Sequence, residues 1–441
     1  MDEKRQAAVD IVRRLRAEGF QAYLVGGCVR DLVMGREPAD YDITTDAAPE
    51  QVVKLFPESL TVGAQFGVVL VPRESGNVEV ATFRSDGRYT DGRHPAQVTY
   101  AKTAREDVRR RDFTINGLLM DPAGEEIFDY VGGQVDIRAR RVRTIGDAVE
   151  RFSEDRLRML RAVRFAARFG FELDRATLKA IQELAPEIRD VSAERVRDEI
   201  LKILTEGQAR RGFELLEQTA LLKEVLPEIK ALQGVGQPPE FHPEGDVWTH
   251  TLMMLAGLPA GVTQTLALGV LLHDVGKPPT FTVRERIRFD NHVDVGAKMA
   301  EEICRRLRMP LKETERVFEL VTHHLRFKDF PKMRRSTQLR FIRMPGFEEH
   351  LELHRLDCLS SHRNLENYEL ARKLLTETPE EEVKPAPLVT GHDLIAAGYK
   401  PGPLFKEILR AVEDAQLEGK LRTRDEALGM VAKQFPPGTS S

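Results

Sequence analysis

LVGGCVRDLVMGREPADYDITT, residues 24–45, passes from a strand-like apolar run through a glycine pair into a helix-like pattern. The two glycines, Gly26 and Gly27, stand at the strand-to-helix turn. Glycines at such a turn let backbone N–H groups approach a phosphate, whose charge the helix dipole favours. Arg30 offers either a bidentate contact to that phosphate or a structural contact to Asp31. The segment therefore predicts a domain of mixed strands and helices with a phosphate-binding turn.

Two aspartates, Asp40 and Asp42, follow the glycine pair within the same segment. At a spacing of two on a strand, both side chains face one side. Their oxygens suit Mg²⁺, and two such ions activate an attacking hydroxyl and hold a triphosphate. Glu79, in VEVATFR, is the candidate third carboxylate on a neighbouring strand. The alternatives are a solvated acidic turn for the aspartates, and a surface position or pairing with Arg84 for Glu79.

The segment RRRDFTING, residues 109–117, places Arg110, Arg111 and Asp112 before an apolar run. Such a cluster can bind phosphate and ribose hydroxyls. The alternative is a buried structural ion pair.

The segment SEDRLRMLRAVRFAARFGF, residues 153–171, has a helical pattern with Ser153 as the expected N-cap. Asp155 and Arg158 would then be neighbours on one helix face. An ionised Asp only accepts hydrogen bonds and an Arg only donates them, which matches the Watson–Crick edges of cytosine and adenine. Guanine and uracil present the reverse pattern and are rejected. The alternative is a surface salt bridge.

The composition excludes several classes of protein. Lys+Arg is 66 and Asp+Glu is 70 in 441 residues, a net charge of −4, so the chain is no wholly basic nucleic-acid binder. Three distant cysteines exclude a disulfide scaffold and fit a reducing cytoplasm. Residues 251–272 carry no charge, but a Pro-Ala-Gly turn at 259–261 divides them into two buried helices instead of one membrane span.

Short strand patterns are confined to the first 142 residues, and helical spacing dominates from about residue 150. The fold expected is α+β: a small mixed-sheet head followed by all-α regions. The parts expected are a mixed head at 1–142, a helical neck and body at 143–235, a second helical domain at 236–365 and a helical tail at 366–441. A Pro/Gly-rich linker at 234–246 marks the boundary before the third part.

Segments 24–45, 110–117 and 154–171 resemble the motifs of class II nucleotidyltransferases, the family of bacterial CCA-adding enzymes and poly(A) polymerases. The resemblance implies that the head at 1–142 is a nucleotidyltransferase domain and that 143–235 carries nucleotide-selecting and RNA-binding elements. It implies that Asp40 and Asp42 hold Mg²⁺. It also implies that Asp155 and Arg158, within an E-D-x-x-R motif, pair with CTP or ATP. Residues 85–95 resemble the flexible loop that CCA-adding enzymes carry and CC-only enzymes lack. The catalytic set expected is Asp40, Asp42 and Glu79, and the remaining nucleotide contacts are Gly26, Gly27, Arg30, Arg111, Asp112, Asn116, Arg161 and Arg164.

Ten of the eleven histidines lie between residues 242 and 392. Imidazole with carboxylate suits a transition metal that activates water. The ordered H…HD…D set across about 240–365 resembles the HD phosphohydrolase superfamily. Each histidine taken alone is also compatible with a purely structural role. The metal ligands that the resemblance implies are His250, His273, Asp274 and Asp357, with His292 and His323 extending the site to two metals.

The expected function is template-independent addition of C, C and A from CTP and ATP to the 3′ end of tRNA. A metal-dependent phosphohydrolase activity is expected in the HD domain. The alternatives are an A-adding enzyme or poly(A) polymerase, and an HD hydrolase whose head only senses nucleotide. The expected location is the cytoplasm, with no membrane partner. The sequence leaves open full CCA against A-only addition, the HD metal and substrate, the oligomeric state and the role of residues 366–441.

Overall fold

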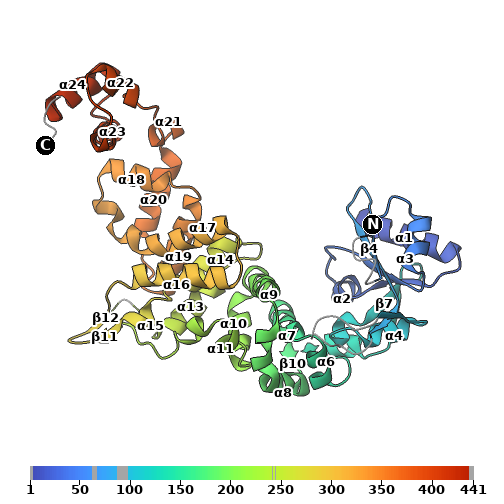
Figure 1. The fold of residues 1–441 in the computed structure, drawn as a ribbon. Helices are drawn as coiled ribbons and strands as arrows, with labels where there is room; N and C mark the ends of the chain where they lie inside the picture. The colour runs from blue at the N-terminus through green and yellow to red at the C-terminus, as the bar shows by residue number, and fades with distance from the viewer. Residues whose placement is uncertain (1–2, 62–66, 87–97, 241, 244, 437–441) are drawn as a thin grey trace. The chain divides into compact units, whose positions relative to one another are not determined.

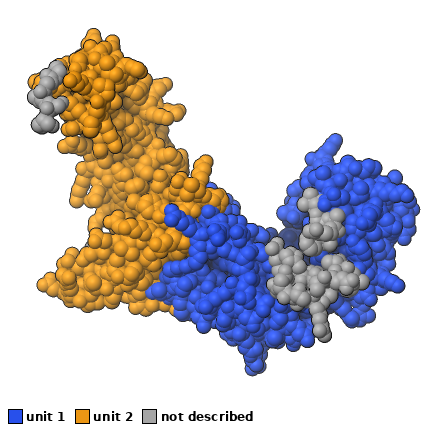
Figure 2. Space-filling model, viewed as in Figure 1, with its two compact units in different colours: residues 1–231, 258–264, 304–309 blue, residues 232–257, 265–303, 310–441 orange. Residues whose placement is uncertain are grey.

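The computed structural model describes residues 3–61, 67–86, 98–240, 242–243 and 245–436 (Figure 1). The chain divides into two compact units, coloured separately in Figure 2. Unit 1 comprises residues 1–231, 258–264 and 304–309, and unit 2 comprises residues 232–257, 265–303 and 310–441. The first change of unit, after Ala231, lies close to the predicted linker at 234–246. The finer division into four parts stays a prediction.

Unit 1 begins with a small mixed sheet of six strands in the order β3-β4-β2-β1-β7-β8. Strands β2 and β4 are parallel, and the other neighbouring pairs are antiparallel. This sheet and the helical remainder confirm the predicted α+β class. The strands are β1 (Ala22–Val25), β2 (Asp42–Thr45), β3 (Val68–Val71), β4 (Val78–Thr82), β7 (Leu118–Asp121) and β8 (Glu126–Asp129). The helices of the head are α1 (Glu3–Ala17), α2 (Gly27–Val33), α3 (Pro49–Leu55), α4 (Ala104–Arg109), η2 (Thr114–Asn116) and α5 (Gly133–Arg138).

The register of the sheet brings the two N-terminal motifs together. Val25, the last residue of β1, lies opposite Asp42, the first residue of β2. Gly26 therefore follows β1 beside the start of β2, and its N–H donates to the carbonyl of Leu118 on β7 at 3.0 Å. A glycine turn and a carboxylate that lie 16 residues apart in sequence thus share one edge of the sheet.

A separate antiparallel pair is formed by β5 (Arg84–Asp86) and β6 (Val98–Tyr100). Residues 87–97 between them lie outside the described residues, and they include most of the segment predicted as a flexible loop.

The rest of unit 1 is helical apart from a short parallel pair, β9 (Arg141–Val142) with β10 (Glu172–Leu173). The central helix is α7 (Leu157–Phe169), whose ten buried residues face the helices around it. It ends because Gly170 adopts the left-handed conformation at φ 67°. The surrounding helices are α6 (Ala148–Glu154), α8 (Arg175–Leu184), η3 (Ala185–Asp190), α9 (Ala193–Thr205), α10 (Ala209–Gln218), α11 (Leu222–Val225) and α12 (Pro227–Lys230).

The uncharged segment at 251–272 lies in two helices, as predicted. These are α13 (Val247–Ala256) and α14 (Gln264–Leu272), and the segment between them contains the predicted turn. No helix in the described part of the chain is long and apolar enough to cross a membrane. The next elements are α15 (Lys277–Thr280), the hairpin strands β11 (Phe281–Val283) and β12 (Ile287–Phe289), α16 (His292–Arg306), α17 (Leu311–His323), η4 (His324–Lys332), α18 (Arg335–Ile342) and α19 (Phe347–Ser360).

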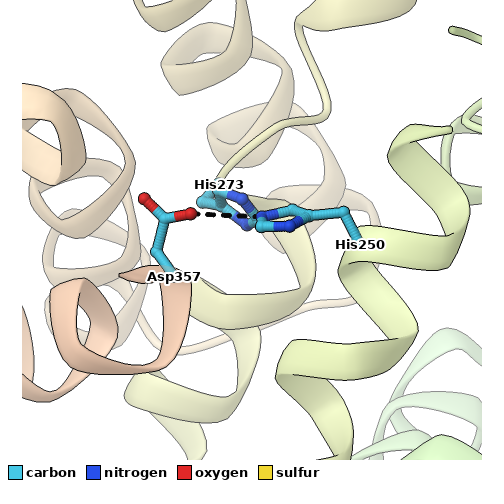
Figure 3. A group of neighbouring side chains, drawn as sticks. All are labelled: His250, His273 and Asp357. Carbon is cyan, nitrogen blue, oxygen red and sulfur yellow. Dashed lines mark ion pairs between the residues drawn. The ribbon is translucent and has the colours of Figure 1, made fainter. Parts of the chain in front are cut away.

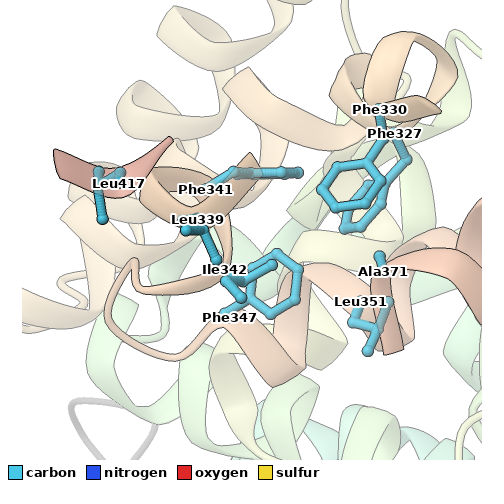
Figure 4. Close-up of a cluster of buried hydrophobic side chains, with 9 residues drawn as sticks. All are labelled: Phe327, Phe330, Leu339, Phe341, Ile342, Phe347, Leu351, Ala371 and Leu417. Atoms are coloured by element: carbon cyan, nitrogen blue, oxygen red, sulfur yellow. The ribbon is translucent and has the colours of Figure 1, made fainter. Parts of the chain in front are cut away.

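A cluster of buried apolar side chains that includes four phenylalanines forms a core of unit 2 (Figure 4). Phe327 and Phe330 of η4 pack in it with Phe341 of α18 and Phe347 of α19. Side chains of α20 (Glu366–Glu377) and α21 (Glu380–Val383) pack against the same core. A second core, which includes Leu394, Ile408 and Val412, is formed by the last helices, α22 (Gly391–Ala396), α23 (Pro403–Leu417) and α24 (Arg424–Gln434).

Candidate functional site

One pocket of about 540 Å³ in unit 1 collects the residues of the N-terminal motifs. Every predicted nucleotide-binding residue lines this pocket, and both aspartates of the D-x-D motif do so as well. Its walls come from the glycine turn, the start of β2, the segment before η2, and helices α7 and α9. The residues that line this nucleotide pocket are Gly26, Gly27, Arg30, Asp40, Asp42, Arg110, Arg111, Asp112, Asn116, Asp155, Leu157, Arg158, Arg161, Arg164, Phe165 and Arg195.

The D-x-D carboxylates, Asp40 and Asp42, line this pocket, and the exposed Glu79 stands beside Asp42 without lining the pocket. Asp42 begins β2, Asp40 stands two residues before it, and Glu79 lies on β4, the parallel neighbour of β2. Burial, together with the charges of Glu79 and Asp40, raises the pKa of Asp42 to about 7, although Arg111 opposes the shift. Desolvation also raises the pKa of Glu79. Carboxylates that oppose each other's ionisation form a site at which a divalent cation is stabilised.

The glycine turn is built for a close approach. Gly26 has φ 75°, and a Cβ on it would lie 3.2 Å from Nη1 of Arg111. Arg30, in contrast, is turned inward: its guanidinium donates to Asp31 at 2.8–2.9 Å and to Oδ1 of Asn116 at 2.6 Å. It is 5 % exposed. Of the two roles that the sequence leaves open for Arg30, the structure shows the structural contact to Asp31.

Asp112 is the buried centre of a charge network. Its Oδ2 accepts two hydrogen bonds from Arg161, at 2.7 and 2.9 Å, and its Oδ1 accepts one from Asn116 at 3.1 Å. Burial favours the neutral carboxyl, but Arg161 and Asn116 outweigh burial and lower the pKa of Asp112 to about 2. The carboxylate of Asp112 therefore stays charged in the pocket at pH 7 and at any pH well above 2.

Replacement of Asp112 by asparagine should lower the free energy of unfolding by about 2–4 kcal/mol at pH 7, because the amide leaves Arg161 without its carboxylate. The folded pKa of Asp112, about 2, is below its ordinary value of 3.8. Its contribution is therefore complete above about pH 4 and is lost as the pH falls toward 2. Urea unfolding of wild type and variant at pH 7, 5 and 3.5 should show a difference that narrows only at the lowest pH.

Asp10→Asn is the matched control, since Asp10 is exposed on α1 and, among the described residues, its side chain bonds to Gln6 and Arg13 of the same helix. A difference between wild type and Asp112→Asn that is equal at all three values of pH would contradict the assigned charge network.

Asp155 and Arg158 line the same pocket, and each is hydrogen-bonded to a neighbouring side chain or backbone group. Asp155 interrupts the helical conformation between α6 and α7 with φ −148°. Its Oδ1 accepts a hydrogen bond from the N–H of Leu157 at 3.1 Å. Its Oδ2 accepts from Arg195 of α9 at 2.8 Å. Arg158 donates to Oε2 of Glu154 at 2.5 Å. An acceptor and a donor thus stand next to each other, each held by a different partner.

The expected helix start at Ser153 is wrong. Ser153 lies inside α6, whose N-cap is Asp147, because that side chain accepts from the N–H of Glu150 at 3.0 Å. The helical pattern of the sequence continues across Asp155, so the pattern does not reveal that one helix ends and another begins there.

Arg195 is a pocket residue that the sequence does not point to. It lies on α9, in the segment AERVRDEI, whose apolar spacing signals only a helix. Arg164 was predicted to contact nucleotide, and it does line the pocket. Its Nε donates to Glu199 of α9 at 2.6 Å, and both residues are buried. Helix α9 thus holds two residues of the pocket: Asp155 through Arg195, and Arg164 through Glu199.

In unit 2, the histidines and aspartates of the predicted HD site form two groups of three possible metal ligands. In each group the ligand atoms lie within 4.8 Å of one another. Nε2 of His250 lies 3.2 Å from Oδ1 of Asp357 (Figure 3). Nε2 of His273 lies 3.1 Å from Oδ2 of Asp274. The groups are His250, His273 and Asp357, and Asp274, His292 and His324.

The ring orientation of three histidines fits a bound cation. Nδ1 of His273, of His292 and of His324 each lies 2.6–2.9 Å from the carbonyl oxygen three residues earlier. A carbonyl only accepts, so Nδ1 carries a proton, and Nε2 is the atom that each ring can offer to a metal. Nε2 of His292 and Nε2 of His324 each stand 3.9 Å from Oδ1 of Asp274, with no hydrogen-bond partner among the described residues.

Asp274 supplies only acceptor atoms to these rings. Burial favours its neutral form, but His273 and Lys277 hold the pKa of Asp274 well below its usual range. Nε2 of His292 and Nε2 of His324 face this ionised carboxylate without a hydrogen bond, and a metal ion between the three groups would bind all of them. The residues present therefore fit a metal.

The prediction of His323 as a ligand is wrong by one residue. His323 ends α17 and His324 begins η4, and successive residues of a helix point in different directions. The ring of His324 lies 5.5 Å from that of His273, whereas the ring of His323 lies 5.9 Å from that of His350. His324 takes the place expected for His323.

A cavity of about 520 Å³ adjoins this candidate metal centre. It is lined by His324 of one group, by Asp357 of the other, and by Leu325, Lys328 and Asn364. A ligand of small-molecule size can therefore reach both groups.

Matches to family models agree with this arrangement. A model described as the poly A polymerase head domain matches residues 22–143. One described as a probable RNA and SrmB-binding site of polymerase A matches residues 170–233, and an HD domain model matches residues 247–353. Fold and sites together define a class: a nucleotidyltransferase of the poly(A) polymerase type joined to an HD domain.

The CCA-adding enzyme of Streptococcus mutans is 30 % identical over 429 residues, which are 96 % of this chain and 95 % of that protein. The chain belongs to the CCA-adding enzyme family.

Other relatives match over a shorter span. The CCA-adding enzyme of Geobacillus thermodenitrificans is 46 % identical over 216 residues, 49 % of this chain and 53 % of that protein. The chain thus matches only about half the length of such relatives. Among solved structures, the Bacillus stearothermophilus CCA-adding enzyme in complex with CTP has a TM-score of 0.75 at 29 % identity, covering 98 % of this chain and 99 % of that one. The Thermotoga maritima CCA-adding enzyme shares the fold, with a TM-score of 0.62 at 20 % identity over 99 % of this chain and 96 % of that one.

Proposed function

We propose that this chain adds C, C and A, taken from CTP and ATP, to the 3′ end of tRNA. The observation that carries the proposal is that one pocket is lined by the glycine turn, by the D-x-D aspartates and by Asp155 with Arg158. A polymerase without a template needs these three parts together: a place for the triphosphate, a place for a cation and a means to select the base. Membership of the CCA-adding enzyme family and the CTP complex of the Bacillus stearothermophilus enzyme support the same substrates.

In this proposal Asp40 and Asp42 would hold Mg²⁺, with Glu79 beside them. The ion, when bound, supplies activation of the attacking hydroxyl and neutralisation of triphosphate charge. Backbone N–H groups at the glycine turn orient the triphosphate. Arg111 and Asp112 contact the ribose and place the α-phosphate next to the tRNA 3′-hydroxyl. This hydroxyl attacks the α-phosphate, and pyrophosphate leaves. Positioning and electrostatic stabilisation together account for the catalysis.

Base selection is assigned to Asp155 and Arg158. Asp155 accepts from the amino group of cytosine or adenine, and Arg158 donates to the ring nitrogen beside it. Guanine and uracil would place a carbonyl acceptor against Asp155 and a ring N–H donor against Arg158. These groups would stay unpaired, and the two bases are therefore rejected. The contacts to Arg195 and Glu154 support this role, because they hold the two side chains in place at the wall of the pocket.

The test uses three tRNA substrates that end at the discriminator base, at C and at CC. Each receives CTP, ATP or both, and products are resolved at single-nucleotide length. Growth by three, two and one nucleotides, with a stop at CCA, is the expected result. Addition of A alone to the CC-ended substrate would instead identify an A-adding enzyme, and long A tails on any RNA would identify a poly(A) polymerase.

We further propose a metal-dependent phosphohydrolase activity for the HD domain of unit 2. The observation that favours it is the pair of ligand groups, in which Nε2 of His273, of His292 and of His324 lies within 3.9 Å of Asp274, with an adjoining cavity that admits a small ligand. Imidazole and carboxylate ligands suit a divalent transition metal. The competing proposal, an HD hydrolase with a head that only senses nucleotide, predicts no growth of any of the three tRNAs.

We also propose a cytoplasmic location. The three cysteines, all buried and free of disulfide bonds, support a reducing compartment.

A further inference from the structure

A second cavity of unit 1, of about 420 Å³, has three arginines in its wall and no acidic residue among the described residues that line it. Arg109 reaches it from the end of α4, Arg143 from the segment after β9, and Arg151 from α6. We call it the arginine cavity. It shares no lining residue with the nucleotide pocket.

The positive charge of the arginine cavity exceeds what its neighbours neutralise. Arg143 is paired through Nε with Oδ2 of Asp136 at 2.8 Å, and Asp136 is buried behind the wall. Arg109 is exposed and makes no ion pair within the described part of the chain. At least one guanidinium group is therefore available to an anion.

Arg151 connects the arginine cavity with the nucleotide pocket. Its Nη1 donates to Oε2 of Glu154 at 2.7 Å, and the same oxygen accepts from Arg158 of the base-selecting pair. One carboxylate thus serves two guanidinium groups. Arg151 also donates from Nε to the carbonyl of Ile145 at 3.1 Å, which leaves its Nη2 toward the arginine cavity.

The chemistry of the arginine cavity selects a phosphate group. Guanidinium groups bind phosphate oxygens with paired, charge-assisted hydrogen bonds. A volume of about 420 Å³ has room for a sugar as well as a phosphate. Arg138 and Arg140 lie on and just after the neighbouring α5, and both are exposed without an ion pair among the described residues. Spaced arginines suit a polymer with one negative charge per nucleotide.

We propose that the arginine cavity binds a backbone phosphate of the RNA substrate while the incoming nucleotide lies in the nucleotide pocket. The inference rests on the proposed function, since it says where that RNA is held. RNA is preferred to a free anion because the cavity is larger than one phosphate and because exposed arginines continue beyond it.

The experiment measures binding of the full-length protein to fluorescently labelled tRNA that ends at CC, by anisotropy, in a series of KCl concentrations. Arg109→Gln removes one charge that no internal ion pair uses. It should weaken tRNA binding about three- to tenfold at 0.1 M KCl and reduce the slope of log Kd against log salt by about 1. The KM for CTP at saturating tRNA should stay at its wild-type value, because Arg109 does not line the nucleotide pocket.

Arg105→Gln is the matched control, since Arg105 is an exposed arginine on the same helix and does not line the arginine cavity. It should leave both the Kd and the salt slope unchanged. Equal binding of tRNA by wild type and Arg109→Gln would overturn the inference, as would an Arg109→Gln effect confined to inhibition by inorganic phosphate. Wild type that binds no tRNA at all would be a failure of the proposed function, which the same series detects separately.

Discussion

Replacing Asp42 by asparagine should lower the rate of nucleotide addition by about a thousandfold or more and leave the fold intact. Asp42 stands where the sheet edge meets the glycine turn, with Asp40 and Glu79 beside it. An amide at this position removes the negative charge that attracts the cation but keeps the size of the side chain. Loss of one electrostatic group at a reacting phosphate costs roughly 10²–10³ in rate, and loss of a metal ligand costs more.

The measurement is a single-turnover time course of C addition to tRNA that ends at the discriminator base. Far-UV circular dichroism and thermal unfolding check that the variant is folded. Relief of repulsion among the three carboxylates should keep its Tm equal to or above that of wild type in Mg²⁺-free buffer at pH 8. Addition at more than a tenth of the wild-type rate would show that the D-x-D aspartates have been assigned wrongly.

Replacing His273 by alanine should abolish hydrolysis in the HD domain and leave nucleotide addition unchanged. His273 offers Nε2 to the group with His250 and Asp357, and it stands 3.1 Å from Asp274 of the other group. Its loss therefore affects both groups at once. We expect hydrolysis of p-nitrophenyl phosphate, measured with added divalent transition metals, to fall about a thousandfold or to background.

Metal content per chain, measured by mass spectrometry after dialysis, should fall in parallel with hydrolysis. His392→Ala is the matched control, because His392 is an exposed histidine of α22 outside both groups. Asp42→Asn provides the reciprocal control, with hydrolysis kept and addition lost. If His273→Ala lost both activities while it remained folded, the idea of two independent sites would fail.

The nucleotide pocket could be predicted well because its parts are short local motifs. The pair Gly26–Gly27 needs only a strand before it and a helix after it. The register that sets Val25 opposite Asp42 then follows from two adjacent strands. The spacing of residues in such a motif defines their relative positions, so the pocket residues could be named from the sequence alone.

Contacts between distant segments could not be predicted in the same way. Arg195 reaches Asp155 from 40 residues away, and nothing in its own segment distinguishes it from any arginine on a helix. The choice between His323 and His324 depends on where α17 ends, and helix ends are what sequence patterns define least well. Arg30 had two plausible partners, and only the packed interior decides for Asp31.

The membership of unit 1 has a consequence for synthesis of the chain. Residues 258–264 and 304–309 belong to unit 1, although the chain on both sides of each belongs to unit 2. The carbonyl of Thr205 accepts from Gly261 at 2.9 Å, and Glu228 pairs with Arg306 at 2.8 Å. A nascent chain that has reached Ala231 therefore lacks partners that appear up to 78 residues later. At about 5–20 residues per second, the first unit waits on the ribosome for several seconds, incompletely packed and open to chaperones, before it can close.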